Sequence, residues 1–525
     1  MRRAAVLSAL LLLGAAPPSP FPWLVFVALV PWVRAARALE LGAAARAGAW
    51  LFGVYWGAAL LWIPQAGLRV GAWTLAAWLA VVLTLTLIGA AFGALLHLLH
   101  RRARWPLPLA LSLAWVAVEV ARTDLLGPLS FGWLGIALPL TQLPSLLQAA
   151  AWVGEAGLAL GVVAINGAVV GLVSDPGRGR RREAFALVCA LMLVAVFGAR
   201  RIASLPLHPQ GSWVVVQPAV PLEARRGPAA NDASIRAVEA HIDAAGRLAR
   251  AIDAWAVVLP ETVLEGAPEL TTHVFMDWQR RAGVPLITGV EGRLDRVTAT
   301  HDGQSSSDRA GAAARERRTN AVAVFTPAGA IAYTHKVWLV PGVERRPGDP
   351  DGWVPGARPQ PLTVERLAPL RAESGPDFAR TVGALVCIES TAPGLTLELA
   401  RDGVDLLVNV TNDAWLAEAE WWTRSPAFAQ HPAHLVLRSV EVGISALRVG
   451  NNGRTELIDP LGRRMRLLPD HQSGIARADA VRHAGPTPYV QWGWVVRWLI
   501  VAASLAGMGV AAVSPSREPR GVQAR

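Results

Sequence analysis

The sequence is short of charged residues, of lysine and of cysteine. Only 17% of its 525 residues are charged, whereas about 25% is usual for a soluble protein, and 53% are apolar. This composition excludes a disordered chain, a nucleic-acid-binding tail and an ordinary cytosolic enzyme as descriptions of the whole protein. Two cysteines, Cys189 and Cys387, are too few for a disulfide framework, and we expect no disulfide. The composition indicates a membrane protein that carries a soluble part.

Long apolar runs fill the first 200 residues, and one more lies near the C-terminus. A helix of about 20 apolar residues crosses a bilayer core. We therefore predict eight spans, at 4–16, 21–33, 47–64, 71–97, 106–121, 148–173, 184–199 and 493–513. The first run could instead be a signal peptide, but no small-residue cleavage site precedes the second run. A retained helix is the preferred interpretation.

Arginine clusters predict the orientation of these spans, because positive charge collects in short cytoplasmic loops. Alternate loops carry Arg2 and Arg3; Arg34, Arg37 and Arg46; Arg101, Arg102 and Arg104; and Arg178, Arg180, Arg181 and Arg182. The intervening loops hold only Arg69 and Arg122. This alternation predicts cytoplasmic termini and an outer location for the chain after Arg200, with Arg497 reaching the outer interface. It also accounts for most of the net charge of +11 without nucleic-acid binding.

The central part of the chain differs from its flanks. We predict a membrane domain at 1–204, a soluble domain at 205–488 and a closing helix with a tail at 489–525. Short apolar runs typical of buried strands lie at 213–217, 256–259, 285–289, 321–325, 382–387 and 405–410. Helical patterns at 231–252 and 392–402 complete an α/β or α+β layered domain, and 297–319 is interpreted as a mobile loop. No metal-ligand spacing is found, so we expect no metal or other cofactor.

Three chemically suitable residues lie at or near the ends of predicted strands. Glu261 can serve as a base with a raised pKa, although a helix-start acid or a loop salt bridge is the alternative. Lys336 is the only lysine of the chain, which indicates a need for a compact ammonium unless it is retained by chance. Cys387 is either reactive or a small buried apolar residue. Cys189 lies inside an apolar run and is interpreted as structural.

Together these residues suit acyl transfer through a cysteine. The thiolate attacks a carbonyl, a carboxylate takes the thiol proton, and an ammonium stabilises the oxyanion. A Cys–His pair is the other common arrangement. His335, His431 and His434 are available for it, but no sequence pattern favours any of them.

The order Glu261, Lys336, Cys387 resembles the triad of the nitrilase superfamily, and the membrane layout resembles the apolipoprotein N-acyltransferases of bacteria. Further similar motifs are Thr319-Asn320-Ala321; Leu339-Val340-Pro341 with Glu344; Asn409 with Asn412-Asp413-Ala414-Trp415; Arg448 with Asn451-Asn452-Gly453; and Tyr489 after Pro488. The resemblance implies an α-helical integral membrane bundle of about eight transmembrane helices. This bundle would carry an extracytoplasmic nitrilase-like αββα sandwich domain.

The resemblance also implies roles for individual residues. Glu261 would be the general base, Lys336 the oxyanion stabiliser and Cys387 the nucleophile, while Glu344 would orient the lysine. Further supporting or substrate-contacting positions would be Glu389, Asn320, Asn412 and Trp415. The implied enzyme is a multi-pass protein of the bacterial inner membrane with both termini in the cytoplasm, and a monomer is expected.

The implied reaction has two halves. Cys387 would take an acyl chain from a phosphatidylethanolamine-like phospholipid as a thioester. The α-amine of the diacylglyceryl-cysteine at an apolipoprotein N-terminus would then accept that chain, in the last step of lipoprotein maturation.

Some positions depart from the family pattern. Pro341-Gly342-Val343-Glu344 stands where Pro-Phe-Gly-Glu is usual, and Ile388 replaces an aromatic residue after the cysteine. The segment between Trp415 and Gln430 is longer than expected. Its tryptophans, Trp421 and Trp422, are interpreted either as an interfacial lid or as packing within a larger loop.

Two other functions compete with this interpretation. A membrane-tethered nitrilase-type amidase would begin with the same cysteine attack but use water in its second step. The eight predicted spans favour lipid substrates, because a soluble amide needs no such anchor. A catalytically inactive membrane scaffold is the other alternative, and the intact Glu261, Lys336 and Cys387 count against it.

Overall fold

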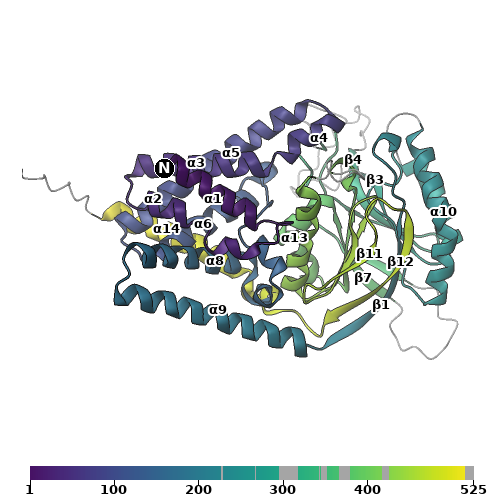
Figure 1. The fold of residues 1–525 in the computed structure, drawn as a ribbon. Coiled ribbons are helices and arrows are strands. Elements are labelled where there is room, and N and C mark those ends of the chain that lie inside the picture. Colours follow the sequence, from purple (N-terminus) through teal and green to yellow (C-terminus); the bar gives the residue numbers. More distant parts are fainter. Residues whose placement is uncertain are drawn as a thin grey trace, which may run out of the picture. The chain divides into compact units, whose positions relative to one another are not determined.

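The structure is a computed structural model that describes residues 1–225, 229–266, 268–294, 317–341, 343–344, 352–365, 379–416 and 425–514 (Figure 1). The chain forms two compact units. The first combines Met1–Ala203 with Gln491–Arg525, and the second is Ser204–Val490. Each unit is described below by itself.

The first unit is helical. Its α-helices are α1 (Arg2–Ala15), α2 (Val30–Ala36), α3 (Leu41–Ala59), α4 (Trp62–Val70), α5 (Trp73–His97), α6 (Leu107–Val120), α7 (Pro144–Leu147), α8 (Ala150–Ser174), α9 (Arg178–Ser204) and α14 (Val495–Val513). Among the described residues, five helical stretches are long and apolar enough to cross a membrane: Leu41–Gly67, Trp73–Arg102, Ala150–Ser174, Arg178–Ser204 and Tyr489–Val513. The other three predicted spans correspond to α1, to the short helices at Pro22–Ala36 and to α6. The total of eight spans stays a prediction.

Glycine permits the close packing of α3 on α5. A Cβ atom on Gly48 would lie 2.0 Å from the carbonyl oxygen of Gly89, and one on Gly93 would lie 2.0 Å from that of Ala44. The two helices therefore approach backbone to backbone, as small residues allow in membrane bundles. Arg497 of α14 forms an ion pair with Asp124 of the same unit, because a largely buried cation needs a counter-charge. Its position at the outer interface stays a prediction.

The second unit contains two six-stranded sheets. Their strand orders are β12-β1-β2-β3-β4-β5 and β11-β10-β9-β8-β7-β6. The first sheet is built from β1 (Leu207–Gln217), β2 (Val257–Val258), β3 (Leu286–Leu294), β4 (Arg317–Phe325), β5 (Ile331–His335) and β12 (Gly474–His483). The second is built from β6 (Leu362–Glu365), β7 (Ala379–Val386), β8 (Leu406–Thr411), β9 (Ala446–Gly450), β10 (Thr455–Ile458) and β11 (Arg464–Leu468). The first and last strands of the unit pair antiparallel, with Leu207 opposite His483.

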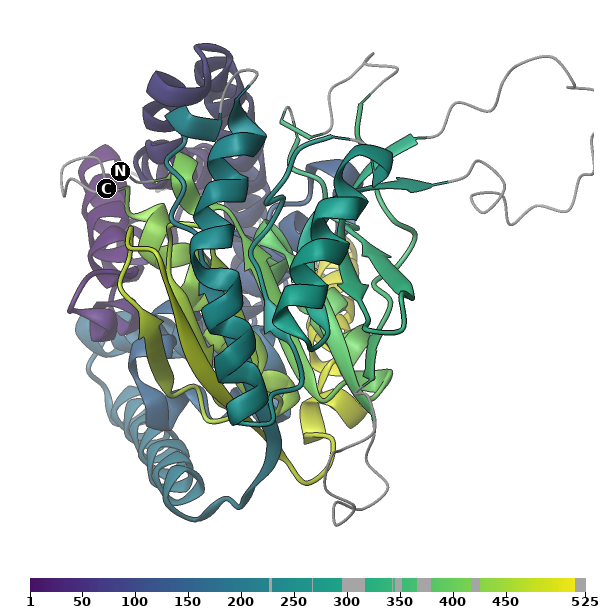
Figure 2. The same ribbon diagram turned by 90° about the vertical axis from the view of Figure 1, so that its right-hand side faces the viewer.

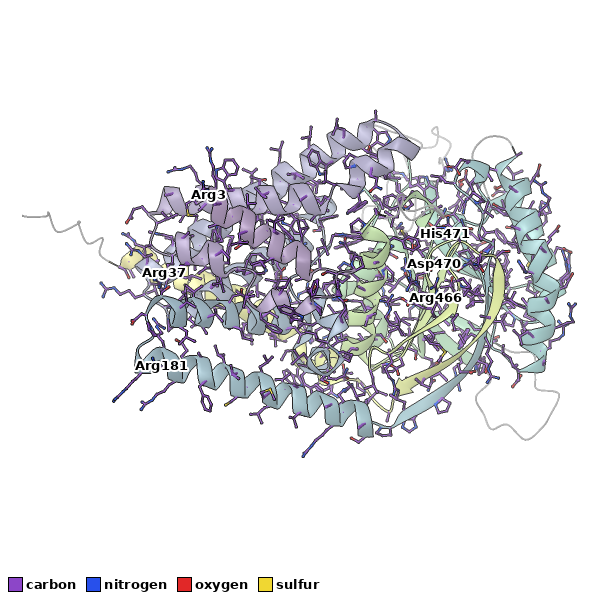
Figure 3. The ribbon with its side chains drawn as sticks, in the orientation of Figure 1. Arg3, Arg37, Arg181, Arg466, Asp470 and His471 are labelled. Carbon is purple, nitrogen blue, oxygen red and sulfur yellow. The ribbon has the colours of Figure 1, made fainter. Side chains whose placement is uncertain are left out.

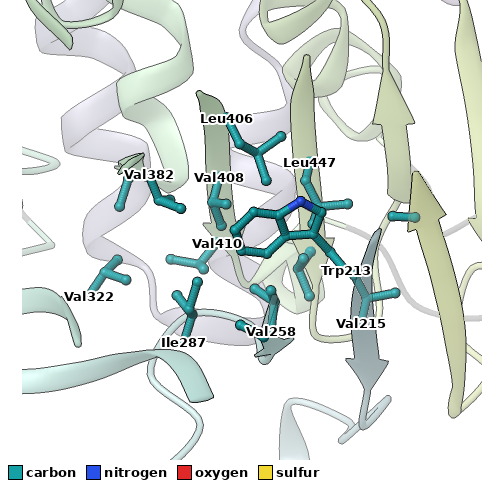
Figure 4. Close-up of a cluster of buried hydrophobic side chains, with 14 of the residues drawn as sticks. Trp213, Val215, Val258, Ile287, Val322, Val382, Leu406, Val408, Val410 and Leu447 are labelled. Atoms are coloured by element: carbon teal, nitrogen blue, oxygen red, sulfur yellow. The ribbon is translucent and has the colours of Figure 1, made fainter. Parts of the chain in front are cut away.

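Helices cover the outer face of each sheet. Helices α10 (Ala230–Ala251) and α11 (Pro268–Ala282) pack side by side on the first sheet (Figure 2). Helices α12 (Pro393–Arg401) and α13 (Ala427–Val442) pack on the second. Between the sheets lies a core of valine, leucine and isoleucine side chains around Trp213 (Figure 4). These four layers are the αββα sandwich that the resemblance implied.

The candidate site residues follow strands of both sheets, two in each. Strands β2 and β3 run parallel to β1, while β8 runs parallel to β7 and β9. Glu261 follows β2, Lys336 follows β5, Cys387 follows β7 and Asn412 follows β8. The carboxyl ends of parallel strands share one edge of a sheet, which is where α/β proteins place their ligand sites.

Most of the predicted segments match the structure. All six predicted strands overlap observed ones, and both predicted helical patterns match α10 and α12 within two residues. Most of the predicted mobile loop at 297–319 lies outside the described residues. Its last residues, 317–319, belong instead to β4, because they pair with 292–294 of β3.

Candidate active site

Lys336 lies between two carboxylates. Its Nζ atom donates a hydrogen bond of 2.8 Å to Glu344 Oε1 and stands 3.7 Å from Glu261 Oε1. The lysine side chain is only 1% exposed. Burial alone would lower its pKa, but the charges of Glu344 and Glu261 outweigh burial and raise the pKa above its usual value. Lys336 therefore stays cationic at every physiological pH.

Backbone and amide donors fix both carboxylates. Asn320 on β4 donates through Nδ2 to Glu261 Oε1 at 2.9 Å and to Glu344 Oε1 at 2.8 Å. The remaining oxygens are held by main-chain N–H groups, that of Asn412 on Glu261 Oε2 at 3.0 Å and that of Val340 on Glu344 Oε2 at 2.8 Å. A carboxylate held at both oxygens has one orientation, so Glu261 is preorganised beside the lysine.

Cys387 begins a short 3₁₀-helix directly after β7, with a φ of 52°. A non-glycine residue in this left-handed region carries backbone strain of about 1–3 kcal/mol, and such strain collects at functional sites. The side chain is buried. Burial and the charge of Glu261 raise the pKa of the Cys387 thiol, while Lys336 lowers it. The resting thiol is therefore neutral, and it must lose its proton to a nearby base as it attacks.

Glu389 ties the turn at Cys387 to the segment after Lys336. Its Oε2 accepts from the Val386 N–H at 2.8 Å, and its Oε1 accepts from the N–H groups of Val337 at 2.6 Å and Trp338 at 3.0 Å. Burial raises the pKa of this carboxyl to about 7, even though the three donors favour the ionised form. Glu389 therefore joins two site segments through their backbones.

A raised pKa on Glu389 predicts a stability that falls as the pH rises. The native state binds a proton that the unfolded state has lost between about pH 4.5 and 7, so folding is weakened across this window by about 3 kcal/mol. The unfolding midpoint of the detergent-solubilised protein, measured from pH 5 to 8, should fall more steeply in the wild type than in Glu389→Gln. Equal slopes in the two proteins would contradict this assignment.

The other predicted site residues lie in several environments. Asn412 contributes its backbone to Glu261, and Trp415 ends a 3₁₀ turn (Asp413–Trp415), partly exposed. Trp421 and Trp422 lie outside the described residues. Two of the three histidines considered for a Cys–His pair bind other side chains, His335 that of Thr319 and His431 that of Asp413. The third, His434, is fully buried on α13. The charged groups that act most strongly on the Cys387 thiol are Glu261, Lys336, Asp413 and Glu344.

The sequence did not predict that four residues named in separate motifs or alternatives form one buried polar group behind the cysteine. Asn409, Asp413, His431 and Arg448 form it, and none is more than 2% exposed. An arginine inside an apolar strand was the signal available in the sequence, at Leu447-Arg448-Val449. Within the described residues, no group of histidine, cysteine and carboxylate side chains could hold a metal ion.

Two protein families match consecutive parts of the chain. Residues 8–168 match the apolipoprotein N-acyltransferase N-terminal domain, and residues 230–484 match the carbon-nitrogen hydrolase family. The chain is therefore a membrane protein whose second unit belongs to the carbon-nitrogen hydrolase family of the nitrilase superfamily. This pairing of domains, together with the relatives described next, shows that the chain belongs to the apolipoprotein N-acyltransferase family.

Three relatives carry the name apolipoprotein N-acyltransferase. The protein of Gloeobacter violaceus is 29% identical and aligns over 97% of this chain and 93% of its own length. That of Geobacter metallireducens is 35% identical over 23% of this chain, and the second such protein of Treponema pallidum is 29% identical over 44%. These two alignments span 22% and 39% of the relatives' own lengths. Among solved structures, an amidase of the nitrilase superfamily from Nesterenkonia AN1 is 16% identical, with a TM-score of 0.36, covering 55% of this chain and 95% of that one.

Proposed function

We propose that this protein is an apolipoprotein N-acyltransferase that works through a thioester on Cys387. It takes an acyl chain from a membrane phospholipid and gives it to the α-amine of the diacylglyceryl-cysteine at the N-terminus of apolipoproteins. The observation that carries the proposal is the position of the Lys336 ammonium between the carboxylates of Glu261 and Glu344, beside a buried and strained cysteine. Membership of the family and apolar helices of membrane-spanning length support a lipid donor.

In the first half-reaction, the Cys387 sulfur attacks the ester carbonyl of a phospholipid, such as phosphatidylethanolamine. The thiol proton passes to Glu261, and the Lys336 ammonium stabilises the oxyanion of the tetrahedral intermediate. Collapse of the intermediate breaks the ester C–O bond. The leaving alkoxide takes the proton back from Glu261, which yields a lysophospholipid and the thioester.

In the second half-reaction, the neutral α-amine of the apolipoprotein attacks the thioester carbonyl. Lys336 again faces the developing oxyanion, and Glu261 accepts the proton that the amine loses as the C–N bond forms. The C–S bond then breaks, and the sulfur recovers a proton from Glu261. Because the donor and the acceptor are both anchored in the bilayer by acyl chains, confinement to the membrane lowers the entropy cost of bringing each to the enzyme.

The proposed location is the bacterial inner membrane, with both termini in the cytoplasm and the catalytic unit on the outer face. Arg3, Arg37 and Arg181 gather toward one end of the helical unit (Figure 3). That gathering agrees with the preference of arginine for cytoplasmic loops. A monomer is proposed, because one chain supplies every residue of the candidate site.

The thioester is the intermediate that tests this function. Purified protein mixed with phosphatidylethanolamine should gain the mass of one acyl chain, which neutral hydroxylamine removes. Cys387→Ser should gain none, and Cys189→Ser should behave as the wild type because its cysteine lies in α9. A folded wild type without an adduct, in the presence of intact lipid, would contradict the proposal. Hydrolysis of small amides by the same sample would then favour an amidase.

A further inference from the structure

Two polar side chains stand next to each other in the second sheet, on the face opposite the apolar core. Asn409 of β8 pairs in register with Arg448 of β9 on one side and with Leu385 of β7 on the other. Their neighbours along the strands, such as Val408 and Val449, point into the core between the sheets. Asn409 and Arg448 have no exposed surface. A strand position with this burial usually holds an apolar residue, so this pair calls for a physical explanation.

Hydrogen bonds link these two side chains to the backbone of the cysteine. Asn409 Nδ2 donates to the carbonyl oxygens of Cys387 and Leu385, both at 3.2 Å. Arg448 Nη1 donates to Asn409 Oδ1, which fixes the orientation of the amide. Arg448 Nη2 donates to Asp413 Oδ2 at 2.7 Å. The arginine therefore uses separate nitrogens to join the asparagine to the aspartate.

Asp413 anchors the far end of this chain of contacts. Its Oδ1 accepts from Thr411 Oγ1 at 3.1 Å and lies 3.0 Å from His431 Nδ1 on α13. Burial alone would raise the pKa of Asp413, but Arg448 and His431 outweigh burial and hold the pKa below its usual range. The next residue toward the N-terminus, Asn412, donates its backbone N–H to Glu261. The same anchor thus touches the segment that orients the candidate base.

We propose that Asn409, Arg448 and Asp413 form a positioning relay that holds the carbonyl of Cys387 and so keeps its thiol in the attacking orientation. None of the three is placed against the reacting atoms, so they are positioning residues. A cysteine with a φ of 52° tends to relax toward an ordinary conformation, and a fixed hydrogen bond to its carbonyl opposes that relaxation. The use of a phospholipid as acyl donor rests on the proposed function, whereas the orientation of the Cys387 thiol by the relay does not.

The geometry makes the exchange of arginine for lysine informative. Lysine keeps the charge but presents one nitrogen, which cannot reach Asn409 and Asp413 as the guanidinium fork does. Asn409→Asp is the complementary change. It keeps the size and the contact with Arg448, but it replaces the donor to Cys387 and Leu385 by an acceptor that repels both carbonyls.

The test uses the full-length protein in detergent with Cys189→Ser, so that Cys387 is the remaining cysteine. A short activated ester, p-nitrophenyl acetate, acylates a poised thiol, and the burst of p-nitrophenolate gives the acylation rate. Single-turnover thioester formation with phosphatidylethanolamine is measured in parallel. We expect Asn409→Asp to slow both by about 10- to 100-fold and Arg448→Lys by about 10-fold, with KM for the lipid unchanged. If Asn409→Asp does not fold, Thr411→Val should slow them by about threefold.

Arg438→Lys is the matched control, because Arg438 is equally buried and pairs with Glu441 at 3.0 Å. It should lower the unfolding midpoint as much as Arg448→Lys while leaving the burst rate within about twofold. Equal slowing in both variants, or unchanged rates in the relay variants, would overturn the relay. A wild type without any burst would overturn it as well. A p-nitrophenolate burst without thioester formation from phosphatidylethanolamine would contradict the proposed acyl donor but not the relay.

Discussion

Lys336→Arg is expected to lower the rate of thioester formation by about 100- to 1,000-fold. The ammonium is buried and stands 2.8 Å from Glu344 and 3.7 Å from Glu261. A planar guanidinium is larger and directs its N–H groups differently, so it places no donor where the oxyanion forms. The loss should fall on kcat rather than on KM for the lipid, because the oxyanion exists only after attack begins.

The matching control is the reverse exchange at an exposed site. Arg466 on β11 pairs with Asp470 and is about half exposed, so Arg466→Lys should leave the rate unchanged. Single-turnover thioester formation is measured for both variants. A Lys336→Arg enzyme that acylates within a few-fold of the wild type would remove lysine from the proposed mechanism.

Glu261→Gln is expected to slow acylation by about 100- to 10,000-fold and to change its pH profile. In the wild type the thiol is neutral, because burial and Glu261 raise its pKa, and the carboxylate accepts the proton during attack. Without this base, the residual rate depends on preformed thiolate. That rate should rise with pH, because burial still keeps the pKa of the thiol above its usual value and the thiolate fraction grows as the pH approaches it.

Glu344→Gln separates this role from simple support of the lysine. Both glutamates accept from Asn320 and lie beside Lys336, so their replacement disturbs the same contacts. Glu344→Gln should reduce the rate while keeping the wild-type pH dependence, since Glu261 still takes the proton. The measurement is the single-turnover rate from pH 6 to 9. Identical profiles for the two variants would contradict the assignment of Glu261 as the base.

The sequence predicted the buried strands of the second unit better than the strands at the edges of its sheets. Parallel strands that are buried on both faces are continuous apolar runs, so β7 and β8 were recognisable from composition alone. Strand β11 lies at the edge of its sheet and its first three residues, including Arg464 and Arg466, are exposed, so it lacks the continuous apolar run that marked the buried strands. In the helical unit, the α-helical part of the predicted span 106–121 ends at Val120, because the chain continues from α6 as a π-helical turn over Ala121–Leu125.

Rarity and position, rather than contacts, identified the candidate site in the sequence. A single lysine and an unpaired cysteine stand out in a list of residues, and Cys387 ends a predicted strand. The contacts of Asn409 and Arg448 depend on strand register, which a single sequence does not specify. The double hydrogen bond of Asn320 depends in the same way on where β4 lies between two separate glutamates.

Because its first and last strands pair with each other, the second unit has the form of an inserted domain. Because Leu207 lies opposite His483, the polypeptide enters and leaves this fold at neighbouring points. A domain with adjoining ends can be inserted into another fold without separating the two host segments that flank it.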